Sequence, residues 1–410
     1  MDNVVVLAGT KWQIPLIKRL RYEGYRVVDF NLYPDSPAFQ YADEACIVDI
    51  LDCKSCLEYC KQLNPKAIMS EECDIAVPTV AWLSEQLGLK NIGIDIAELY
   101  TNKYRMREFG KENQFETPFF YKCSSIEQAL EAYEKFGKKM IMKPLDSNSS
   151  RGVYTVNSKD DIIAFWDKTV GFSKVEKSVL LEEYIDGVEF TIDGIKTENG
   201  HVSLAISEKK HYEYNENIAC TLYFTYENEK FDYDELRAVN DRFVNLSGLP
   251  FGFTHAEYKY KDGKFYLIEI GARGGGNLIS AVIVPLVSGV DNYNYLINKT
   301  IGKECDENIS ILGSHKERCA ILQFFDVTGK SGVVKEIKGE EYLKNCKQIV
   351  DYCLYFGIGD RISQAEDDSK RIGYYIAYGE NEIELQNVIS QVKDSFEIIL
   401  EENADERTNS

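Results

Sequence analysis

The residues best suited to chemistry lie between positions 255 and 276. Glu257 and Glu269 flank a predicted turn, Asp262-Gly263, and so fall on the two strands of a β-hairpin. Carboxylate oxygens are the ligands that Mg²⁺ prefers, and two of them can hold the ion against polyphosphate oxygens. Arg273 and three glycines follow, and a guanidinium offers a planar fork for a carboxylate or a phosphate. This composition suits phosphoryl transfer.

The register of this hairpin decides whether the two glutamates can act together. With a strict two-residue turn, Glu257 would pair with Ile268, and Glu269 would point to the opposite face of the sheet. Joint metal binding therefore requires a three-residue loop or a β-bulge. A half-exposed hairpin without a metal is the alternative that this segment alone leaves open.

A second segment, residues 139–153, joins a strand that ends in Lys143 to a loop of small polar residues. Backbone N–H groups and hydroxyls of such a loop can bind phosphate oxygens, and Gly152 permits a close approach. Lys143 would supply a point charge for the α- or β-phosphate. A surface turn with a lysine extended into water fits the same residues.

A third segment, residues 180–190, is an apolar strand followed by acidic residues and a glycine. The Glu182 carboxylate could accept a hydrogen bond from an adenine amine, and the main chain at Tyr184 and Ile185 could meet the ring edge. Glu189 could bind ribose hydroxyls. Taken alone, the segment equally fits a solvated acidic turn.

The first hundred residues alternate apolar strands with helices, which predicts a Rossmann-like parallel sheet covered on both faces. No G-x-G-x-x-G fingerprint follows the first strand, so we expect a scaffold without a cofactor of its own. Strands are expected at 4–8, 25–30 and 66–70, and helices at 12–23 and 77–87.

The remaining chain predicts α+β structure with antiparallel sheets. Helices are expected at 95–112, 125–136, 343–353 and 382–396, and strands at 139–143, 151–156, 179–184, 187–195, 319–324, 331–337 and 371–377. The polar residues 401–410 are expected to be disordered.

Composition narrows the possible partners. The 410 residues carry a formal charge of −20, which argues against a nucleic-acid or anionic-membrane partner. No apolar run reaches membrane-spanning length and no basic leader is present, so a cytoplasmic location is expected.

The eleven cysteines are expected to be reduced. Cys53, Cys56 and Cys60 have the spacing of one helix face, which favours core packing over a metal cluster.

Lys103 and the three segments above occur in the order and approximate spacing of the ATP-grasp superfamily, which the chain resembles over nearly its whole length. Tyr33–Ala38 and Asp43 are similar to its Rossmann-like preceding domain, and the last hundred residues to the trailing region of its amino-acid ligase and biotin-carboxylase-like members. The resemblance implies domains at 1–100, 101–310 and 311–400, the central one divided into a lid-bearing part (101–180) and a metal-bearing part (181–310).

The resemblance also implies roles for individual residues. Those expected to contact ATP are Lys103, Lys143, Ser147, Ser150, Arg151, Gly152, Glu182, Tyr184, Ile185 and Glu189. Glu257 and Glu269 would hold Mg²⁺, for which Mn²⁺ could substitute; Arg273 and Lys143 would be catalytic, and Arg273, Gly274 and Gly275 would contact the substrate. Many members have asparagine where this chain has Gly271, so a water or Asn277 would complete the metal site. His255 shares a face with Glu257 and could orient a ligand or pack in the core.

The function that the resemblance implies is an ATP-dependent carboxylate–amine ligase for small molecules. ATP would convert an acid to an acyl phosphate, an amine would displace phosphate, and ADP and phosphate would be released. A small-molecule kinase and a biotin-dependent carboxylase-type subunit are the alternatives, although the chain has no Met-Lys-Met biotinyl segment. The resemblance is compatible with a homodimer. No residue type selects the acid or the amine; Tyr212, Tyr214, Tyr223 and Phe224 hint at an aromatic-walled cavity.

Overall fold

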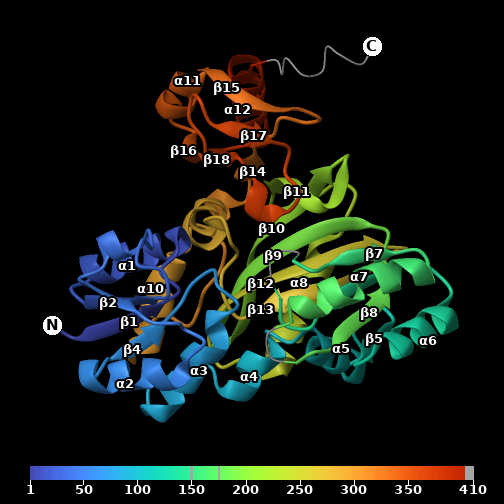
Figure 1. The fold of residues 1–410 in the computed structure, drawn as a ribbon. Coiled ribbons are helices and arrows are strands. Elements are labelled where there is room, and N and C mark those ends of the chain that lie inside the picture. The colour runs from blue at the N-terminus through green and yellow to red at the C-terminus, as the bar shows by residue number, and fades with distance from the viewer. Residues whose placement is uncertain (148–150, 174–175, 402–410) are drawn as a thin grey trace.

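The computed structural model describes residues 1–147, 151–173 and 176–401 (Figure 1). Its N-terminal domain is a parallel sheet with the strand order β3-β2-β1-β4. Apolar residues of β1 point alternately into two cores, one under α1 and the other under α2 and α3. The predicted Rossmann-like scaffold is therefore confirmed. The strands are β1 (Asn3–Leu7), β2 (Arg26–Asn31), β3 (Glu44–Ile47) and β4 (Ala67–Met69), and the helices are α1 (Ile14–Tyr22), α2 (Cys53–Leu63) and α3 (Ala76–Gln86).

The helix α2 carries the three closely spaced cysteines. Cys56 and Cys60 are fully buried in the core that α2 shares with β1 and β2, while Cys53 is partly exposed. All three thiols are free. The prediction of core packing is confirmed for the two buried residues, since they act as small apolar side chains.

The predicted helix at 95–112 is wrong as a single element. The chain forms α4 (Ile94–Leu99) and then α5 (Lys103–Glu112), because Asn102 leaves the helical conformation. Its side chain accepts hydrogen bonds from the N–H groups of Tyr104 and Arg105 at 3.0 and 3.2 Å. An N-terminal cap of this kind satisfies donors that a helix start leaves open. It also places Lys103 at the first position of α5.

The lid-bearing part is a small antiparallel sheet with the order β5-β8-β6-β7, covered by two helices (Figure 1). Its strands are β5 (Phe120–Cys123), β6 (Met140–Pro144), β7 (Tyr154–Val156) and β8 (Val179–Glu183), and its helices are α6 (Ile126–Phe136) and α7 (Lys159–Gly171). The antiparallel pairing of β6 and β8 brings the predicted phosphate and adenine segments side by side, with Lys143 opposite Leu180 and Ile141 opposite Glu182.

The metal-bearing part contributes five strands to an eight-stranded sheet with the order β13-β12-β9-β10-β11-β14-β18-β16. The sheet continues past the boundary expected near residue 310, because β11 pairs with β14. Helix α8 (Tyr233–Ser247) packs on β10. The strands are β9 (Val188–Thr197), β10 (Gly200–Tyr212), β11 (Asn215–Phe224), β12 (Gly252–Lys261), β13 (Lys264–Gly271), β14 (Cys319–Phe324), β16 (Ile349–Leu354) and β18 (Gly373–Gly379).

The C-terminal part adds a three-stranded sheet, β17-β15-β19, and two helices. The helix expected at 343–353 is wrong, because α11 ends at Asn345 and residues 349–354 form β16. The β-branched and aromatic side chains there fit a pleated sheet, and Tyr352 pairs with Tyr375 of β18. The elements are β15 (Ser331–Lys338), α11 (Glu340–Asn345), β17 (Arg361–Ser363), α12 (Glu382–Ser395) and β19 (Glu397–Leu400).

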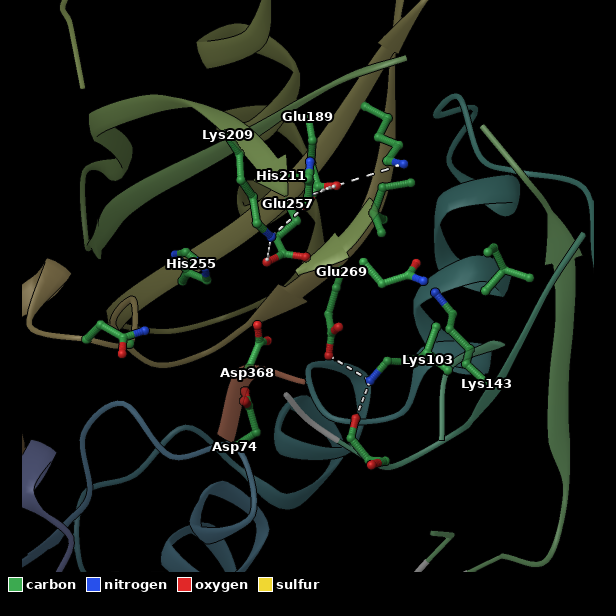
Figure 2. Close-up of a pocket in the computed structure, with 18 of the residues that line it drawn as sticks. Asp74, Lys103, Lys143, Glu189, Lys209, His211, His255, Glu257, Glu269 and Asp368 are labelled. Atoms are coloured by element: carbon green, nitrogen blue, oxygen red, sulfur yellow. Dashed lines mark hydrogen bonds and ion pairs between the residues drawn. The ribbon is translucent and has the colours of Figure 1, made fainter. Parts of the chain in front are cut away.

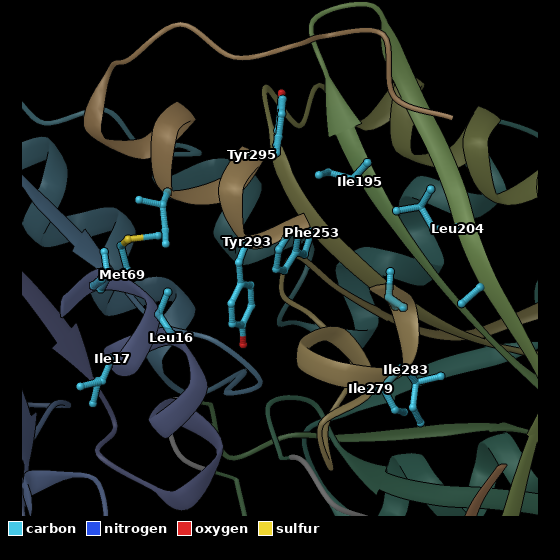
Figure 3. Packing of buried hydrophobic residues seen from close by; sticks show 14 of the residues in the cluster. Leu16, Ile17, Met69, Ile195, Leu204, Phe253, Ile279, Ile283, Tyr293 and Tyr295 are labelled. Carbon is cyan, nitrogen blue, oxygen red and sulfur yellow. The ribbon is translucent and has the colours of Figure 1, made fainter. Parts of the chain in front are cut away.

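One core joins the N-terminal domain to the large sheet (Figure 3). Helix α10 (Asn292–Ile301) contacts both α1 and β4. Its Tyr293 stacks on Phe253 of β12, with ring centroids 6.0 Å apart. This apolar contact fixes the N-terminal loops against the large sheet, where the candidate site lies.

The hairpin of β12 and β13 contains the β-bulge that joint action of its glutamates requires. Asp262 and Gly263 have positive φ angles, as a tight two-residue turn demands, and Tyr258 pairs with Leu267. The next pair is Glu257 with Glu269, so Ile268 is the extra residue. The two carboxylates therefore leave the same face of the sheet.

The buried Asp29 of β2 predicts a pH-dependent stability. Burial raises the pKa of its carboxyl to about 7, despite nearby N–H groups of Gly9 and Phe30. Because the folded pKa lies above the unfolded value of about 4, the native state binds this proton more tightly. The group therefore makes the free energy of unfolding fall, by up to about 4 kcal/mol, as the pH rises from about 4 to above 7. We expect urea unfolding of Asp29→Asn to show a smaller loss of stability than the wild type between about pH 5 and about pH 8. An identical loss in both proteins would contradict this origin.

Candidate active site

A cavity of about 550 Å³ lies between the small and the large antiparallel sheets, with loops of the N- and C-terminal parts at its border (Figure 2). It gathers most of the residues that the sequence predicts for ATP, metal and substrate. Those that line it are Lys103, Lys143, Ser147, Glu182, Tyr184, Ile185, Glu189, Glu257, Glu269 and Arg273. Arg151, Gly152, Gly274 and Gly275 do not line it, and Ser150 lies outside the described residues.

Each of the two predicted metal ligands is paired with a lysine. Lys103 Nζ lies 2.7 Å from Glu269 Oε1, and Lys209 Nζ lies 2.9 Å from Glu257 Oε1 (Figure 2). Burial opposes ionisation of Glu257, but Lys209 outweighs it and lowers the pKa of this carboxyl. Two carboxylates on one face are a donor set that fits Mg²⁺. Within the described residues no group of three or more acidic, cysteine or histidine side chains could hold a metal, so phosphate or water oxygens would complete the shell.

Lys209 of β10 is a residue that sequence reasoning missed. Its ammonium bridges Glu257 and Glu189, with Nζ 2.6 Å from Glu189 Oε1. His211 Nε2 lies 3.3 Å from the other oxygen of Glu189. Burial favours the neutral form of Glu189, but Lys209, the hydrogen bond from His211 and Lys259 outweigh it and lower its pKa. The predicted ribose ligand is thus held ionised, yet most of its acceptor capacity is already engaged.

The carboxylate of Glu182, the predicted adenine ligand, likewise already has partners. One carboxylate oxygen lies 2.5 Å from Lys143 Nζ and the other 2.9 Å from Arg107 Nε. Burial alone would raise the pKa of Glu182, but the two cations lower it. Burial lowers the pKa of Lys143, and Glu182 partly opposes that shift. In this arrangement the Glu182 side chain orients Lys143, and Tyr184 and Ile185 line the cavity.

Arg107 of α5 is another residue that sequence reasoning missed. It has no exposed surface. Besides Glu182, it donates from Nη2 to the carbonyl oxygen of Ile268 at 2.6 Å. Ile268 is the bulge residue, so Arg107 ties the bulge to the end of β8. Its position four residues after Lys103, on the same face of a helix, was the available signal.

A hydrogen bond connects the start of the predicted lid to α5. Lys103 Nζ donates to the carbonyl oxygen of Ser147 at 2.6 Å, and the Ser147 hydroxyl donates to the carbonyl oxygen of Arg151 at 3.0 Å. Gly152 has a φ of +75° and lies against Phe172 and Pro144, where a Cβ atom would collide. The glycine is thus needed for the backbone path into β7.

Arg273 forms a bidentate ion pair with Asp74 of the N-terminal domain. Its Nε and Nη2 atoms each lie 2.8 Å from a carboxylate oxygen. Burial alone would lower the pKa of Arg273, but Asp74 raises it. The pair also accounts for Gly271, because a Cβ atom there would lie 2.9 Å from Asp74 Oδ1. The place of the family's asparagine is filled by this ion pair, while Asn277 lines the cavity.

Gly274 and Gly275 are predicted to contact the substrate. Their backbone N–H groups donate hydrogen bonds to side chains of the protein itself. Gly274 donates to Glu71 Oε1 at 2.8 Å, and Gly275 to Asp193 Oδ1 at 3.0 Å. A Cβ atom at either glycine would collide with these carboxylates. The glycine run therefore lets the chain pass closely over two buried acids, and its substrate role remains a prediction.

His255 of β12 lies beside Asp193 of β9, and His201 of β10 lies beside Asp241 of α8. His255 Nδ1 lies 3.0 Å from Asp193 Oδ1, and His201 Nδ1 lies 2.7 Å from Asp241 Oδ1. The His201 Nε2 atom is closed off by the Thr254 hydroxyl at 2.7 Å, whereas His255 lines the cavity. A carboxylate at Nδ1 favours the tautomer whose Nε2 accepts hydrogen bonds.

Comparisons with known proteins agree with this geometry. Residues 136–281 match the family model described as ATP-grasp domain, and residues 325–401 match L-amino acid ligase C-terminal domain 2. Formate-dependent phosphoribosylglycinamide formyltransferase of Prochlorococcus marinus (strain MIT 9515) is 23% identical over 255 residues, 60% of this chain and 64% of that protein. The enzyme of the same name from Synechococcus sp. (strain CC9605) is 30% identical over 43% of this chain and 46% of its own. The chain thus spans less than two thirds of these relatives.

Similar solved structures cover nearly the whole chain. The L-amino acid ligase of Bacillus licheniformis has a TM-score of 0.79 at 21% identity, with 98% of this chain and 99% of that chain covered. The phosphoribosylglycinamide synthetase of Anaerococcus prevotii has a TM-score of 0.73 at 19% identity, with 98% and 100% covered. The biotin carboxylase domain of the Hydrogenobacter thermophilus 2-oxoglutarate carboxylase, solved with MgADP and bicarbonate, has a TM-score of 0.73 at 16% identity, with 97% and 91% covered.

At these identities the solved structures establish the fold. The match over residues 136–281 shows an ATP-grasp domain in this part of the chain.

Proposed function

We propose that this protein is an ATP-dependent ligase that joins a small-molecule carboxylic acid to an amine through an acyl phosphate. The observation that carries the proposal is the single cavity in which two lysines of the lid side face two carboxylates on the bulged hairpin. Such a site can hold a polyphosphate between cations and a divalent ion.

Phosphoryl transfer to a carboxylate brings together groups that are all negatively charged. Lys103 and Lys143 would bind phosphate oxygens, and Glu257 and Glu269 would hold Mg²⁺. When bound, the ion neutralises charge on the phosphates. Arg273 would stabilise the charge that develops on the acid and on the transferred phosphoryl group.

The second step requires that an amine reach the activated acid before water does. An acyl phosphate hydrolyses in water, so a site of this chemistry needs an enclosed position. The small sheet, with Ser147 at the start of the predicted lid, forms one wall of the cavity. His255 and Asn277 line the cavity together with Arg273 and are candidates to position the amine.

The match of residues 325–401 to L-amino acid ligase C-terminal domain 2 favours the ligase over a kinase on the same fold. The Bacillus licheniformis structure carries the name L-amino acid ligase, and amino acids are therefore the first acids and amines to test. A biotin-dependent carboxylase role has support from the fold alone. None of the helices in residues 1–147, 151–173 and 176–401 is both long and apolar enough to cross a membrane. A homodimer and a cytoplasmic location remain proposals.

The acyl-phosphate route predicts a transfer of oxygen from the acid to phosphate. Amino-acid pairs are first screened for ADP release, with hydroxylamine as a surrogate amine. The active acid is then labelled with heavy oxygen in its carboxylate. Because the carboxylate oxygen attacks phosphorus and later leaves with it, the released phosphate should carry one heavy oxygen, detected by mass spectrometry. Unlabelled phosphate would rule this route out, and turnover with a polyol in place of any acid would support a kinase.

The bidentate geometry of Arg273 predicts a strong effect of a conservative change. In Arg273→Lys the charge remains, but the planar fork is lost. We expect ADP release to slow by about a hundred- to a thousandfold, while ATP binding stays within about twofold. Arg318→Lys is the matched control, because Arg318 makes a similar two-point contact with Glu380 outside the cavity, at 2.7 and 2.9 Å. Equal rates in the two variants would contradict a catalytic role for Arg273.

A further inference from the structure

One corner of the cavity, where the N- and C-terminal parts meet, is not used by the phosphate, metal or adenine positions described above. It is lined by Lys11 and Trp12 from the loop after β1, Phe324 at the end of β14, Tyr355 after β16, and Arg371 before β18. We call these five residues the basic aromatic corner. Tyr212, Tyr214, Tyr223 and Phe224, the aromatic residues suspected from the sequence, do not line the cavity.

Lys11 has its ammonium enclosed by aromatic rings. Nζ lies 3.6 Å from the ring centroid of Tyr355 and 4.2 Å from that of Trp12. No carboxylate among the described residues comes within 4.0 Å of it. Burial lowers the pKa of Lys11 to about 8. The charge is thus partly desolvated, and two ring faces at short range and the Asp351 carboxylate at longer range compensate it.

Arg371 also keeps donors unused. Its side chain is nine-tenths buried, and its guanidinium carbon lies 3.7 Å from the ring centroid of Phe324. Nη2 lies 3.0 Å from the carbonyl oxygen of Ala219 and 2.7 Å from Asp368 Oδ1. Nε has no hydrogen-bond partner within the described part of the chain, and Nη1 makes none there either.

The other cations of the cavity differ from Lys11 in this respect. Lys103, Lys143, Lys209 and Arg273 each have a carboxylate partner at 2.8 Å or less. In a chain with a formal charge of −20, an ammonium with no carboxylate within 4.0 Å among the described residues and an arginine with an unpartnered Nε, both at one cavity wall, are unusual. An anionic ligand would supply the missing partner, and the rings would pack against its apolar part.

We infer that the basic aromatic corner binds a carboxylate that takes no part in the reaction, carried by the apolar or aromatic body of a substrate. The inference rests on the proposed function, because it names the substrate class of the same cavity. A singly charged carboxylate fits better than a phosphate, since Asp368 beside Arg371 repels a second negative charge. The carboxylate belongs either to a second acid group of the acid substrate or to the amine substrate.

A binding experiment without ATP tests the corner directly. Calorimetry compares 3-phenylpropionate with 3-phenylpropan-1-ol, which has the same apolar body and no charge. The unmodified protein should bind the carboxylate at least about tenfold more tightly than the alcohol. In Lys11→Met and in Arg371→Met this preference should fall to about twofold or less. Lys18→Met is the matched control, because Lys18 lies 4.5 Å from the ring centroid of Tyr41 and does not line the cavity.

Three outcomes would overturn the inference: no binding of the carboxylate to the unmodified protein, no preference over the alcohol, or the same preference in Lys11→Met as in Lys18→Met. Circular dichroism of each variant establishes that it is folded. Lys11→Met breaks no ion pair among the described residues, so the test does not depend on the Arg371 variant.

The source of the carboxylate follows from the active acid found with hydroxylamine. If Lys11→Met raises the KM of the acid even with hydroxylamine, which has no carboxylate, the corner binds the acid substrate. If the effect appears only with a carboxylate-bearing amine, it binds the amine. The binding test needs no turnover, so failure of the ligase proposal and failure of the corner give different results.

Discussion

The structure of the site depends on one buried guanidinium. Arg107 bonds the Glu182 carboxylate at the end of β8 and the carbonyl oxygen of the bulge residue Ile268. These contacts connect α5, the small sheet and the bulged hairpin. Removing a partner from a buried ion pair costs about 3–5 kcal/mol, because a charge is left uncompensated. Arg107 therefore fixes both the direction of Lys143, through Glu182, and the register that turns Glu269 toward Glu257.

Around Arg107, positively and negatively charged side chains alternate in the cavity. Lys209 lies between Glu189 and Glu257, Lys103 contacts Glu269, and Asp74 holds Arg273. Lys209 lowers the pKa of Glu189 and of Glu257 despite their burial, and Asp74 raises the pKa of Arg273. Asp74 comes from the N-terminal domain, so the site is completed only when this domain packs on the large sheet through the core in Figure 3.

Much of this arrangement could be predicted from local patterns. The strand 319–324 was predicted with its observed ends, and the need for either a three-residue loop or a β-bulge followed from the spacing of Glu257 and Glu269. The helix at 95–112 was predicted without its break, because the capping preference of Asn102 was not weighed against the surrounding helix formers. Lys209 and Asp74 could not be assigned, because their partners lie 20 to 199 residues away and only the folded chain brings them together.

The central claim is that a magnesium nucleotide binds between the two sheets, with the ion on Glu257 and Glu269. Calorimetric titration of the intact protein with ATP, with and without Mg²⁺, tests it most directly. We expect the affinity for ATP to fall when the ion is withheld. The affinity should fall in the same way in Glu257→Gln and Glu269→Gln when the ion is present. Absence of ATP binding in the presence of Mg²⁺, or binding that neither the ion nor these substitutions affect, would contradict it.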